Sequence, residues 1–373
     1  MSARLVPLAN VDADLAERWR RLGDESLEPN PFVGADFVLP AARWVAAGAP
    51  LAVVIVERGR DVLFALPVTL RPQVLGIPVR AVGTWLHPYS YLGTPLVSRK
   101  DPIGAWEEVI DVLTTVAPWA VFRLFSSDGS TAAALDSVSD RRRRSLGVLH
   151  RPSRPVVRRR PQPTYLAETI SGKGRKDLRR LRRRLGEQLG GDLACVDYAV
   201  PGCDLDWAVK GFLEMEAEGW KGRDGGAMAC HSGHGDFFAE ICRRFAAAGR
   251  LQLWALEAAG RPVAYQCNLL GGNTLFQFKV AFDEALGRYS PGLQLDLDLV
   301  DEFHSDCRLD MIDSCVGATP TFSHQIYPDR RELADLVLPL HGLLGHGVAR
   351  AAPHARAAYR RAKKLRRSVA KGT

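Results

Sequence analysis

The chain has 373 residues, of which 46% are hydrophobic, 25% charged and 8% aromatic. This is a globular composition, and the length suits two domains of roughly 100–200 residues each, which excludes a disordered or fibrous chain. The N-terminus lacks an apolar signal core, and the apolar stretch 333–349 is too short and polar to cross a bilayer. The seven cysteines contain no Cys-x-x-Cys pair, so we expect neither a disulfide framework nor a zinc ribbon, but a cytoplasmic, reducing compartment.

The N-terminal half alternates helices with strands. Two β-rich runs at 51–56 and 62–68, joined by a short polar turn, predict a hairpin. Hydrophobic spacing predicts helices at 12–22, 36–47, 103–116 and 131–138, and a further strand at 121–125.

The C-terminal half has a similar outline. Three runs at 251–257, 263–270 and 275–282 predict an antiparallel meander with tight turns. Helices are expected at 173–189, 205–218, 237–248 and 291–304, and a last strand at 309–314. The shared order of helices, hairpin or meander, helix and strand indicates a degenerate internal repeat.

These elements predict four segments. They are a degenerate N-terminal domain at 1–140, a basic Arg/Pro-rich linker at 141–164, a C-terminal catalytic domain at 165–348 and a basic C-terminal helix at 349–373.

The positive charge is concentrated in two segments. Residues 141–184 hold 17 Lys and Arg against two acids, and residues 350–373 hold nine against none, while the rest of the chain is acidic. Three interpretations are open: a solvated basic face, contact with an anionic membrane or phosphate-rich ligand, and nucleic-acid binding. The last is least favoured, because no aromatic residues interleave with the arginines. The basic C-terminal segment suits peripheral attraction to the inner membrane.

One stretch carries the clearest chemical signal. The predicted strand 275–282 is followed by a short loop and by Pro291-Gly292 at the start of a helix. Proline fits the first turn of a helix, and glycine lets a ligand approach the backbone. The amide groups at that helix end favour an anion such as a pyrophosphate, although an ordinary Pro-Gly helix start has the same sequence.

Three motifs in this order resemble one family. They are GWKGRDGGA at 219–227, GRPVAYQCNL at 260–269 and FKVAFDEALGRYSPG at 278–292. Together they resemble the Fem-like, BioF-like (CelD-type) branch of the GNAT acyltransferases, over about 165–331, with a weaker likeness over 31–97. The resemblance implies an α/β (α+β) fold of two tandem GNAT-like units with mixed, mostly antiparallel sheets flanked by helices.

The resemblance also implies an acyl-thioester donor, usually acyl-CoA, as co-substrate. The donor's pyrophosphate would lie on the loop formed by Arg288, Tyr289, Ser290, Pro291, Gly292 and Leu293. The family has a second small residue two positions after the glycine, where this chain has Gln294. No metal is predicted, since Cys230, His231 and His234 lack further ligands nearby.

Several residues near these motifs are candidates for the site. Lys279 and Asp283 flank the end of the donor strand, where they would position the amine or donor phosphate, or form a surface ion pair. Glu218, the last of three alternating glutamates, is a candidate proton relay. Trp220 is a candidate wall of the acceptor site or a core residue, and Lys221 is a candidate for the same site.

A second group of candidates follows the last predicted strand. Asp313 is a candidate base or orienting group, His324 a candidate general base, and Cys315 a weaker candidate nucleophile in the substrate site. The DSC…YPDRR version of this region resembles the subgroup found in sphingolipid-making proteobacteria, which make ceramide-like lipids.

We therefore predict an acyl-CoA-dependent N-acyltransferase whose acceptor is a lipid amine, such as a sphingoid base, or another envelope amine. One rival interpretation is a Fem-like aminoacyl transfer from aminoacyl-tRNA to a cell-wall precursor, with 173–189 contacting tRNA. The other is a non-catalytic GNAT-derived module in an envelope-assembly complex.

Overall fold

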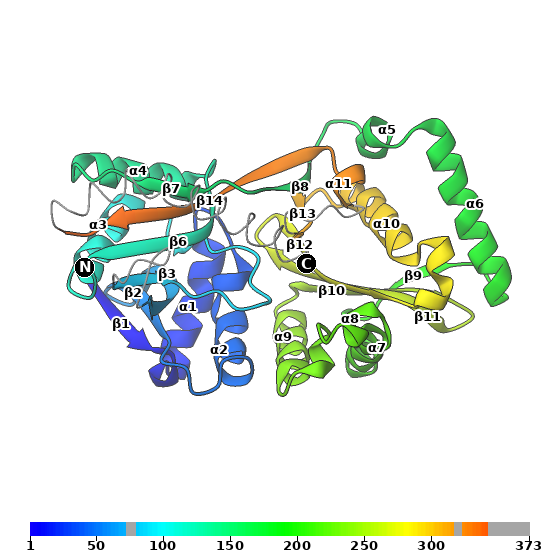
Figure 1. Ribbon diagram of the computed structural model, residues 1–373, viewed down its shortest axis with the longest axis horizontal. Coiled ribbons are helices and arrows are strands. Elements are labelled where there is room, and N and C mark those ends of the chain that lie inside the picture. The colour runs from blue at the N-terminus through cyan, green and yellow to red at the C-terminus, as the bar shows by residue number, and fades with distance from the viewer. Residues whose placement is uncertain (72–79, 317–322, 342–373) are drawn as a thin grey trace, which may run out of the picture. The chain divides into compact units, whose positions relative to one another are not determined.

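The computed structural model describes residues 1–71, 80–316 and 323–341, and it divides into two compact units (Figure 1). Unit 1 comprises 1–38, 49–152 and the chain from residue 332 onward, and unit 2 comprises 39–48 and 153–331. Both units are mixed α/β, as predicted.

Unit 1 is built on a sheet with the order β1-β2-β3-β4-β6-β14, in which only the pairing of β4 with β6 is parallel. Its core is centred on Trp106, which packs edge-on against Phe64 and Phe122. The elements are β1 (Ser2–Pro7), η1 (Leu8–Asn10), α1 (Ala13–Glu25), η2 (Pro31–Val33), α2 (Ala35–Trp44), β2 (Ala52–Arg58), β3 (Asp61–Arg71), β4 (Ala81–Thr84), β5 (Leu96–Val97), α3 (Pro102–Thr114), β6 (Trp119–Ser126), α4 (Ser130–Arg141), β7 (Gly147–His150) and β14 (Asp329–Pro339). Helix α2 ends in unit 2, and β14 begins there.

Unit 2 has the sheet order β9-β10-β11-β12-β13-β8, in which β12 and β13 are parallel. Helix α10 covers one face, while α7 and α9 cover the other (Figure 1). The elements are β8 (Ser153–Arg158), α5 (Tyr165–Thr169), α6 (Gly172–Leu189), β9 (Ala194–Asp197), α7 (Leu205–Glu218), α8 (Trp220–Arg223), η3 (Met228–Cys230), α9 (His234–Ala247), β10 (Leu251–Ala258), β11 (Arg261–Gly271), β12 (Thr274–Phe282), η4 (Glu284–Tyr289), α10 (Pro291–Ser305), β13 (Met311–Asp313) and α11 (Ser323–Ile326).

The two units repeat one chain order. In unit 1, β1 is followed by two helices, the meander β2-β3-β4, helix α3 and the parallel strand β6. In unit 2, β9 is followed by α7–α9, the meander β10-β11-β12, helix α10 and the parallel strand β13. The predicted architecture of two tandem units with mostly antiparallel sheets is confirmed, and α3 corresponds to α10.

The Arg/Pro-rich segment 141–164 is more structured than the predicted linker. It contains β7, which pairs with β14, and β8, which pairs with β13. Pro155 lies inside β8, where Val156 and Val157 are buried, so prolines and arginines there do not mark an extended connection. The predicted C-terminal helix at 349–373 lies outside the described residues.

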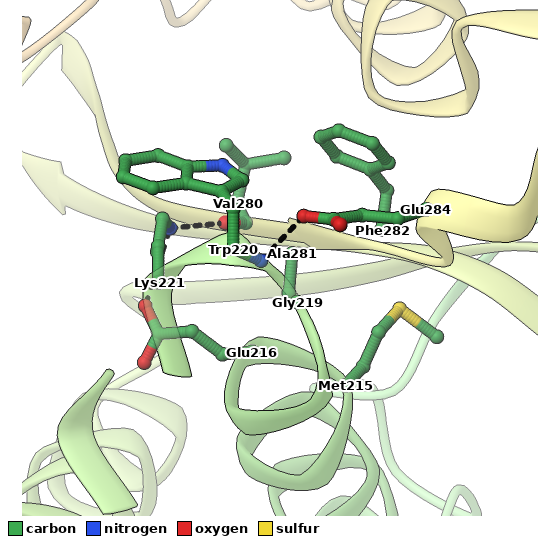
Figure 2. A pocket seen from close by; sticks show the side chains of 9 residues that line it. All are labelled: Met215, Glu216, Gly219, Trp220, Lys221, Val280, Ala281, Phe282 and Glu284. Atoms are coloured by element: carbon green, nitrogen blue, oxygen red, sulfur yellow. Dashed lines mark hydrogen bonds and ion pairs between the residues drawn. The ribbon is translucent and has the colours of Figure 1, made fainter. Parts of the chain in front are cut away.

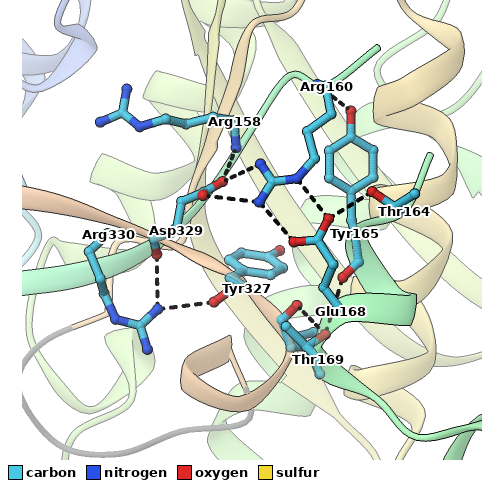
Figure 3. A network of polar contacts seen from close by, with 10 residues as sticks. Arg158, Arg160, Thr164, Tyr165, Glu168, Thr169, Tyr327, Asp329 and Arg330 are labelled. Atoms are coloured by element: carbon cyan, nitrogen blue, oxygen red, sulfur yellow. Dashed lines mark hydrogen bonds and ion pairs between the residues drawn. The ribbon is translucent and has the colours of Figure 1, made fainter. Parts of the chain in front are cut away.

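A polar network fixes the chain that leads into α6 (Figure 3). The Arg160 guanidinium bridges two carboxylates, Glu168 of α5 at 3.0 Å and Asp329 at 3.2 Å. Thr164 donates to the same Glu168, and Thr169 donates to the Ile326 carbonyl of α11. Segments far apart in the sequence are thereby joined around α5. Within the described ranges, no helix combines the length and the hydropathy that a membrane span requires.

Candidate active site

Strand β12 is the centre of the candidate site, because it separates from β13 after a short pairing. The parallel pairs cover Thr274–Phe276 of β12, and Phe276 opposite Asp313 is the last. On its other edge β12 stays paired with β11 as far as Phe282. From residue 277 to residue 282, the described part of the chain places no strand on the edge that faced β13.

A β-bulge lies where the strands separate. Gln277 is opposite Asn268 and Lys279 is opposite Cys267, so Phe278 is an additional residue in β12. A bulge changes the direction of the side chains that follow it. Phe278 and Lys279 consequently both point toward the α7–α9 face, Phe278 onto the ring of Phe238 and Lys279 toward Glu216.

The open edge of β12 presents backbone polar groups. The Val280 carbonyl accepts a hydrogen bond from Lys221 Nζ at 2.7 Å (Figure 2). In an extended strand the N–H and C=O of one residue point to the same side, so the Val280 N–H also faces this edge. A ligand lying along the edge can therefore exchange amide hydrogen bonds with β12.

A shallow pocket adjoins this edge and has partly apolar walls. Met215, Gly219 and Trp220 line it from the end of α7 and the start of α8, while Val280, Phe282 and Glu284 line it from the β12 side (Figure 2). Trp220 is 53% exposed and Val280 36% exposed, which is unusual for large apolar side chains. Because such exposed apolar groups gain from being covered, the pocket favours a ligand with an apolar part.

Three charged side chains meet between α7 and β12. Glu216 is 2% exposed, and its Oε1 lies 3.2 Å from Lys221 Nζ and 3.5 Å from Lys279 Nζ. The other oxygen, Oε2, accepts the Met228 N–H at 2.9 Å. One carboxylate thus serves two ammonium groups, in an interior where charges are costly unless paired.

This environment changes the pKa values of Glu216 and Lys279. Burial alone would raise the pKa of Glu216, but the charges of Lys279 and Lys221 and the Met228 N–H lower that pKa overall. Burial lowers the pKa of Lys279, against the opposing charge of Glu216, and the nearby Lys221 lowers it further. Lys279 is therefore closer to a neutral amine at physiological pH than an ordinary lysine.

Glu216 rather than Glu218 occupies the position beside the lysines. Helix α7 buries Phe212 and Glu216, one helical turn apart, whereas Glu214 and Glu218 are exposed on its other side. The side chain of Glu218 is therefore not part of the cluster, although its backbone carbonyl accepts from Arg223. The four-residue spacing from Phe212 was the signal that would have selected Glu216.

The loop after β12 leads into a helix start without a side-chain cap. Ser290 has φ +54° and is the N-cap of α10, but its side chain makes no cap hydrogen bond, and Pro291 occupies the first turn. The amide groups of the first turn have no partner within a helix, and the helix dipole makes this end attractive to anions. A Cβ on Gly292 would lie 3.4 Å from Phe282 Cδ1, so any longer side chain there meets β12.

The other residues of the predicted loop hold it onto α6. The Arg288 guanidinium and the Tyr289 hydroxyl both donate to Gln188 Oε1, at 2.6 Å each. Gln294, which replaces the small residue of the related pattern, is 1% exposed and donates to the Leu178 carbonyl at 3.2 Å. Its side chain therefore packs toward α6 and does not cover the start of α10.

The equivalent place in unit 1 is filled by the chain itself. Asp101 caps α3, accepting the Gly104 N–H at 2.9 Å, so a carboxylate already occupies that helix start. The edge of β6 beyond its pairing with β4 is also occupied, because the Gly93 N–H donates to the Leu124 carbonyl at 3.0 Å. Thr94 Oγ1 accepts the Ser126 N–H beside it. Of the two compared helix starts and strand edges that the structure describes, those of unit 2 are open and uncapped, and those of unit 1 are not.

Asp313 lies at the last pair of β13 and is fully buried between two arginines. Its Oδ1 lies 2.9 Å from Arg154 Nε and its Oδ2 accepts from Arg331 at 2.9 Å, while the Cys315 N–H also donates to Oδ1. Cys315 is buried with φ +53°, and burial raises the pKa of its thiol well above the ordinary value. A thiol in this state is a poor nucleophile.

Two further predicted residues lie elsewhere. Asp283 accepts the Ala285 N–H as the N-cap of η4 and pairs with Arg261 at 3.0 Å. These are the contacts of a structural residue. His324 lies in α11, and its side chain is outside the described part. No cluster of three metal-ligating side chains occurs among the residues that the structure describes.

Residues 172–322 match the family described as an acetyltransferase (GNAT) domain. The matched region runs from the start of α6 to beyond β13 and includes the open edge of β12 and the start of α10. The matched region lies within unit 2. No curated protein matches the chain.

Among solved structures, the chain resembles FemX with a TM-score of 0.58 at 9% identity, over 91% of this chain and 97% of that one. It also resembles the C-terminal domain of a putative lysylphosphatidylglycerol synthetase from Agrobacterium fabrum, with a TM-score of 0.52 at 12% identity over 89% and 93%. L-PGS from Bacillus licheniformis gives 0.51 at 11% identity over 94% and 96%. The predicted likeness to the Fem-like branch of the GNAT proteins is confirmed at the level of domain and fold.

Proposed function

We propose that unit 2 is an N-acyltransferase that moves an acyl group from acyl-CoA to an amine. The observation that carries this proposal is that the uncapped start of α10 lies beside the open edge of β12, where a Cβ on Gly292 would be 3.4 Å from Phe282 and 3.7 Å from Val280. A phosphopantetheine thioester needs an anion site at one end, amide partners along its arm and a polarising group at its carbonyl. The start of α10, the Val280 backbone and the bulged part of β12 are the groups that would supply these three needs.

The chemical step is a direct attack. The acceptor ammonium gives one proton to Lys279 in its unprotonated form, and the resulting amine attacks the thioester carbonyl, forming a C–N bond. The C–S bond then breaks, the thiolate leaves and takes up the second proton of the attacking nitrogen, and Lys279 releases the first proton to water. Glu216 orients Lys279 and balances its charge once it is protonated.

We assign proton transfer to Lys279 rather than to Asp313, because both oxygens of Asp313 are already engaged by Arg154 and Arg331. In this assignment Asp313 is a positioning residue for the separation of β12 and β13. His324 stays a second candidate base, and Trp220 and Lys221 stay candidates for the acceptor wall.

The acceptor that we propose is a long-chain amine of the sphingoid-base type or another envelope amine. The exposed apolar walls Trp220 and Val280 support an acceptor or acyl group with an apolar chain. The lipid-linked names of two of the structural neighbours point in the same direction. A Fem-like aminoacyl transfer from aminoacyl-tRNA is the second candidate, supported by the similarity to FemX over most of both chains.

The test is binding of a CoA series from acetyl to palmitoyl, measured by calorimetry. Gly292→Glu places a carboxylate at the start of α10, and Gly235→Glu in the first turn of α9 is the matched control, since its Cβ meets only Leu213 at 3.6 Å. We expect binding in the wild type and the control, a loss of at least about tenfold in Gly292→Glu, and tighter binding with longer chains. Equal binding in both variants, or none to any thioester in the wild type, would refute the donor assignment.

Turnover then distinguishes the acceptors. Release of free thiol is followed with long-chain amines and with small amines, using wild type, Lys279→Met and Lys210→Met, the last being an exposed lysine on α7. Loss of turnover only in Lys279→Met supports the assigned base. Transfer from aminoacyl-tRNA in the absence of any acyl-CoA turnover would move the assignment to the second candidate.

A further inference from the structure

Helix α6 has a charged face and an apolar face. It carries eight Lys and Arg and two acids over Gly172–Leu189. At 3.6 residues per turn, its leucines form one face, and Leu185 is fully buried. The opposite face consists of the exposed residues Lys173, Lys176, Arg179, Arg180, Arg183 and Arg184. We call these six residues the basic face.

The basic face is only partly neutralised. Asp177 pairs with Arg180 at 3.0 Å and Glu187 pairs with Arg183 at 3.4 Å, and all four side chains remain 45–72% exposed. Such exposed ion pairs contribute little free energy to stability and are screened by salt. The six cations of the basic face therefore exceed the two acids paired with them by four charges. They extend along about three turns of one straight helix.

The other side of α6 is fixed to the donor site. Arg182 pairs with Asp298 of α10 at 3.0 Å, Gln294 donates to the Leu178 carbonyl, and Gln188 accepts from Arg288 and Tyr289. The network around Arg160 holds α5, which directly precedes α6 (Figure 3). Anything that binds the basic face is therefore held at a defined position relative to η4 and the start of α10.

We propose that the basic face of α6 docks unit 2 onto an anionic phospholipid surface. The proposal adds to the proposed function the place at which that reaction occurs, but it rests on charge and geometry that do not depend on the reaction. Long flexible cations on a straight helix suit a plane of phosphate groups. No aromatic side chain stands on the face to stack on a base, which disfavours single-stranded nucleic acid.

The sequence supplies a second basic signal. Residues 350–373 contain nine Lys and Arg and no acid. Peripheral proteins generally need two weak signals for stable membrane association. The charge of this segment adds to the charge of the basic face.

The experiment is co-sedimentation of the full chain with vesicles of phosphatidylcholine alone or with about 30% phosphatidylglycerol, at about 0.1 M salt. The variant combines Lys176→Gln, Arg179→Gln and Arg184→Gln, which keep good helix formers in place. The matched control combines Arg60→Gln, Lys210→Gln and Arg243→Gln, three exposed cations outside α6. Circular dichroism and thermal unfolding confirm that both fold as the wild type does.

We expect wild-type binding to the anionic vesicles only. A cation near an anionic surface contributes about fivefold to partitioning, so the α6 variant should bind about 100-fold more weakly and the control within about threefold of wild type. Equal binding of variant and control, or no preference for anionic vesicles, would overturn the proposal. So would binding to total tRNA that competes the protein off the vesicles and depends on the same three residues. Because no acyl donor is present, failure here is distinct from failure of the proposed reaction.

Discussion

Replacing Asp296 by asparagine is expected to stabilise the protein at neutral pH and to have little effect near pH 4. Asp296 lies on α10, and its Oδ1 accepts amide N–H groups from Gln277 at 2.7 Å and Gln266 at 2.8 Å. Desolvation raises the pKa of Asp296 from 3.8 to about 6, although both amides favour the ionised form. The asparagine oxygen can accept from the same two amides without carrying a charge.

The sign and size of this stability change follow from the linkage between proton binding and folding. Between pH 3.8 and about 6 the folded state binds the proton more tightly than the unfolded state, so stability falls as pH rises through this window. Raising this pKa from 3.8 to about 6 lowers the free energy of unfolding by about 3 kcal/mol above pH 6. The residue keeps some contact with solvent, so we expect about 1–2 kcal/mol to be recovered in Asp296→Asn.

Urea unfolding of wild type and Asp296→Asn from pH 4 to pH 8 checks this expectation. The difference between the two proteins isolates Asp296, because Asp298 and Asp301, whose pKa values are also raised by burial, titrate in both. The difference should be near zero at pH 4 and reach a plateau above pH 6.5. A difference that does not change with pH, or a variant less stable at pH 8, would refute the reasoning.

Three further predictions concern the two helix starts and the charged cluster. Glu216→Gln leaves Lys279 and Lys221 without their carboxylate and should lower the free energy of unfolding by about 3–5 kcal/mol at pH 7. The loss should be smaller at higher pH, where Lys279 loses its proton. Urea unfolding that shows no loss would contradict the cluster. Asp101→Ala should cost about 1 kcal/mol through the lost cap of α3 but leave thioester binding unchanged, as thermal unfolding and calorimetry would show; tighter binding would place a donor in unit 1. Gly292→Ala should bind palmitoyl-CoA with an affinity within about threefold of wild type. Gly292→Leu should lose about tenfold or more in affinity in the same titration, since only the longer side chain presses on Phe282. Equal affinities would exclude the α10 start from the site.

The repeated fold was accessible from sequence because its longest elements have strong periodic patterns. The meander β10-β11-β12 and helices α3, α7 and α10 each bury one face, and such patterns survive without knowledge of the partner. Strands such as β8 and β14 were less accessible. Arg154 and Arg331 are buried in them only because Asp313 stands between the two, a pairing that no local pattern reveals.

Some features of the candidate site could be predicted from the sequence, and others could not. The start of α10 was predictable, since Pro-Gly after a strand is a local signal. The Phe278 bulge was not, because it is a mismatch of register between two strands and exists only in their pairing. Without the bulge the direction of Lys279 could not be assigned, although the four-residue spacing from Phe212 distinguishes Glu216 from the two other glutamates of α7.

The comparison of the two units explains why the repeat has one candidate site rather than two. Both units keep the parallel pair of strands and the helix between them, which the sheet needs in order to bury both faces. In unit 1 the opening beyond that pair is occupied by the backbone of Gly93 and Thr94, which Asn30 holds through hydrogen bonds to the Leu92 and Thr94 carbonyls. Its helix start already has the Asp101 carboxylate, so a donor phosphate would meet a negative charge there. Closing the edge and capping the helix stabilise a scaffold, whereas unit 2 leaves both groups for a ligand to satisfy.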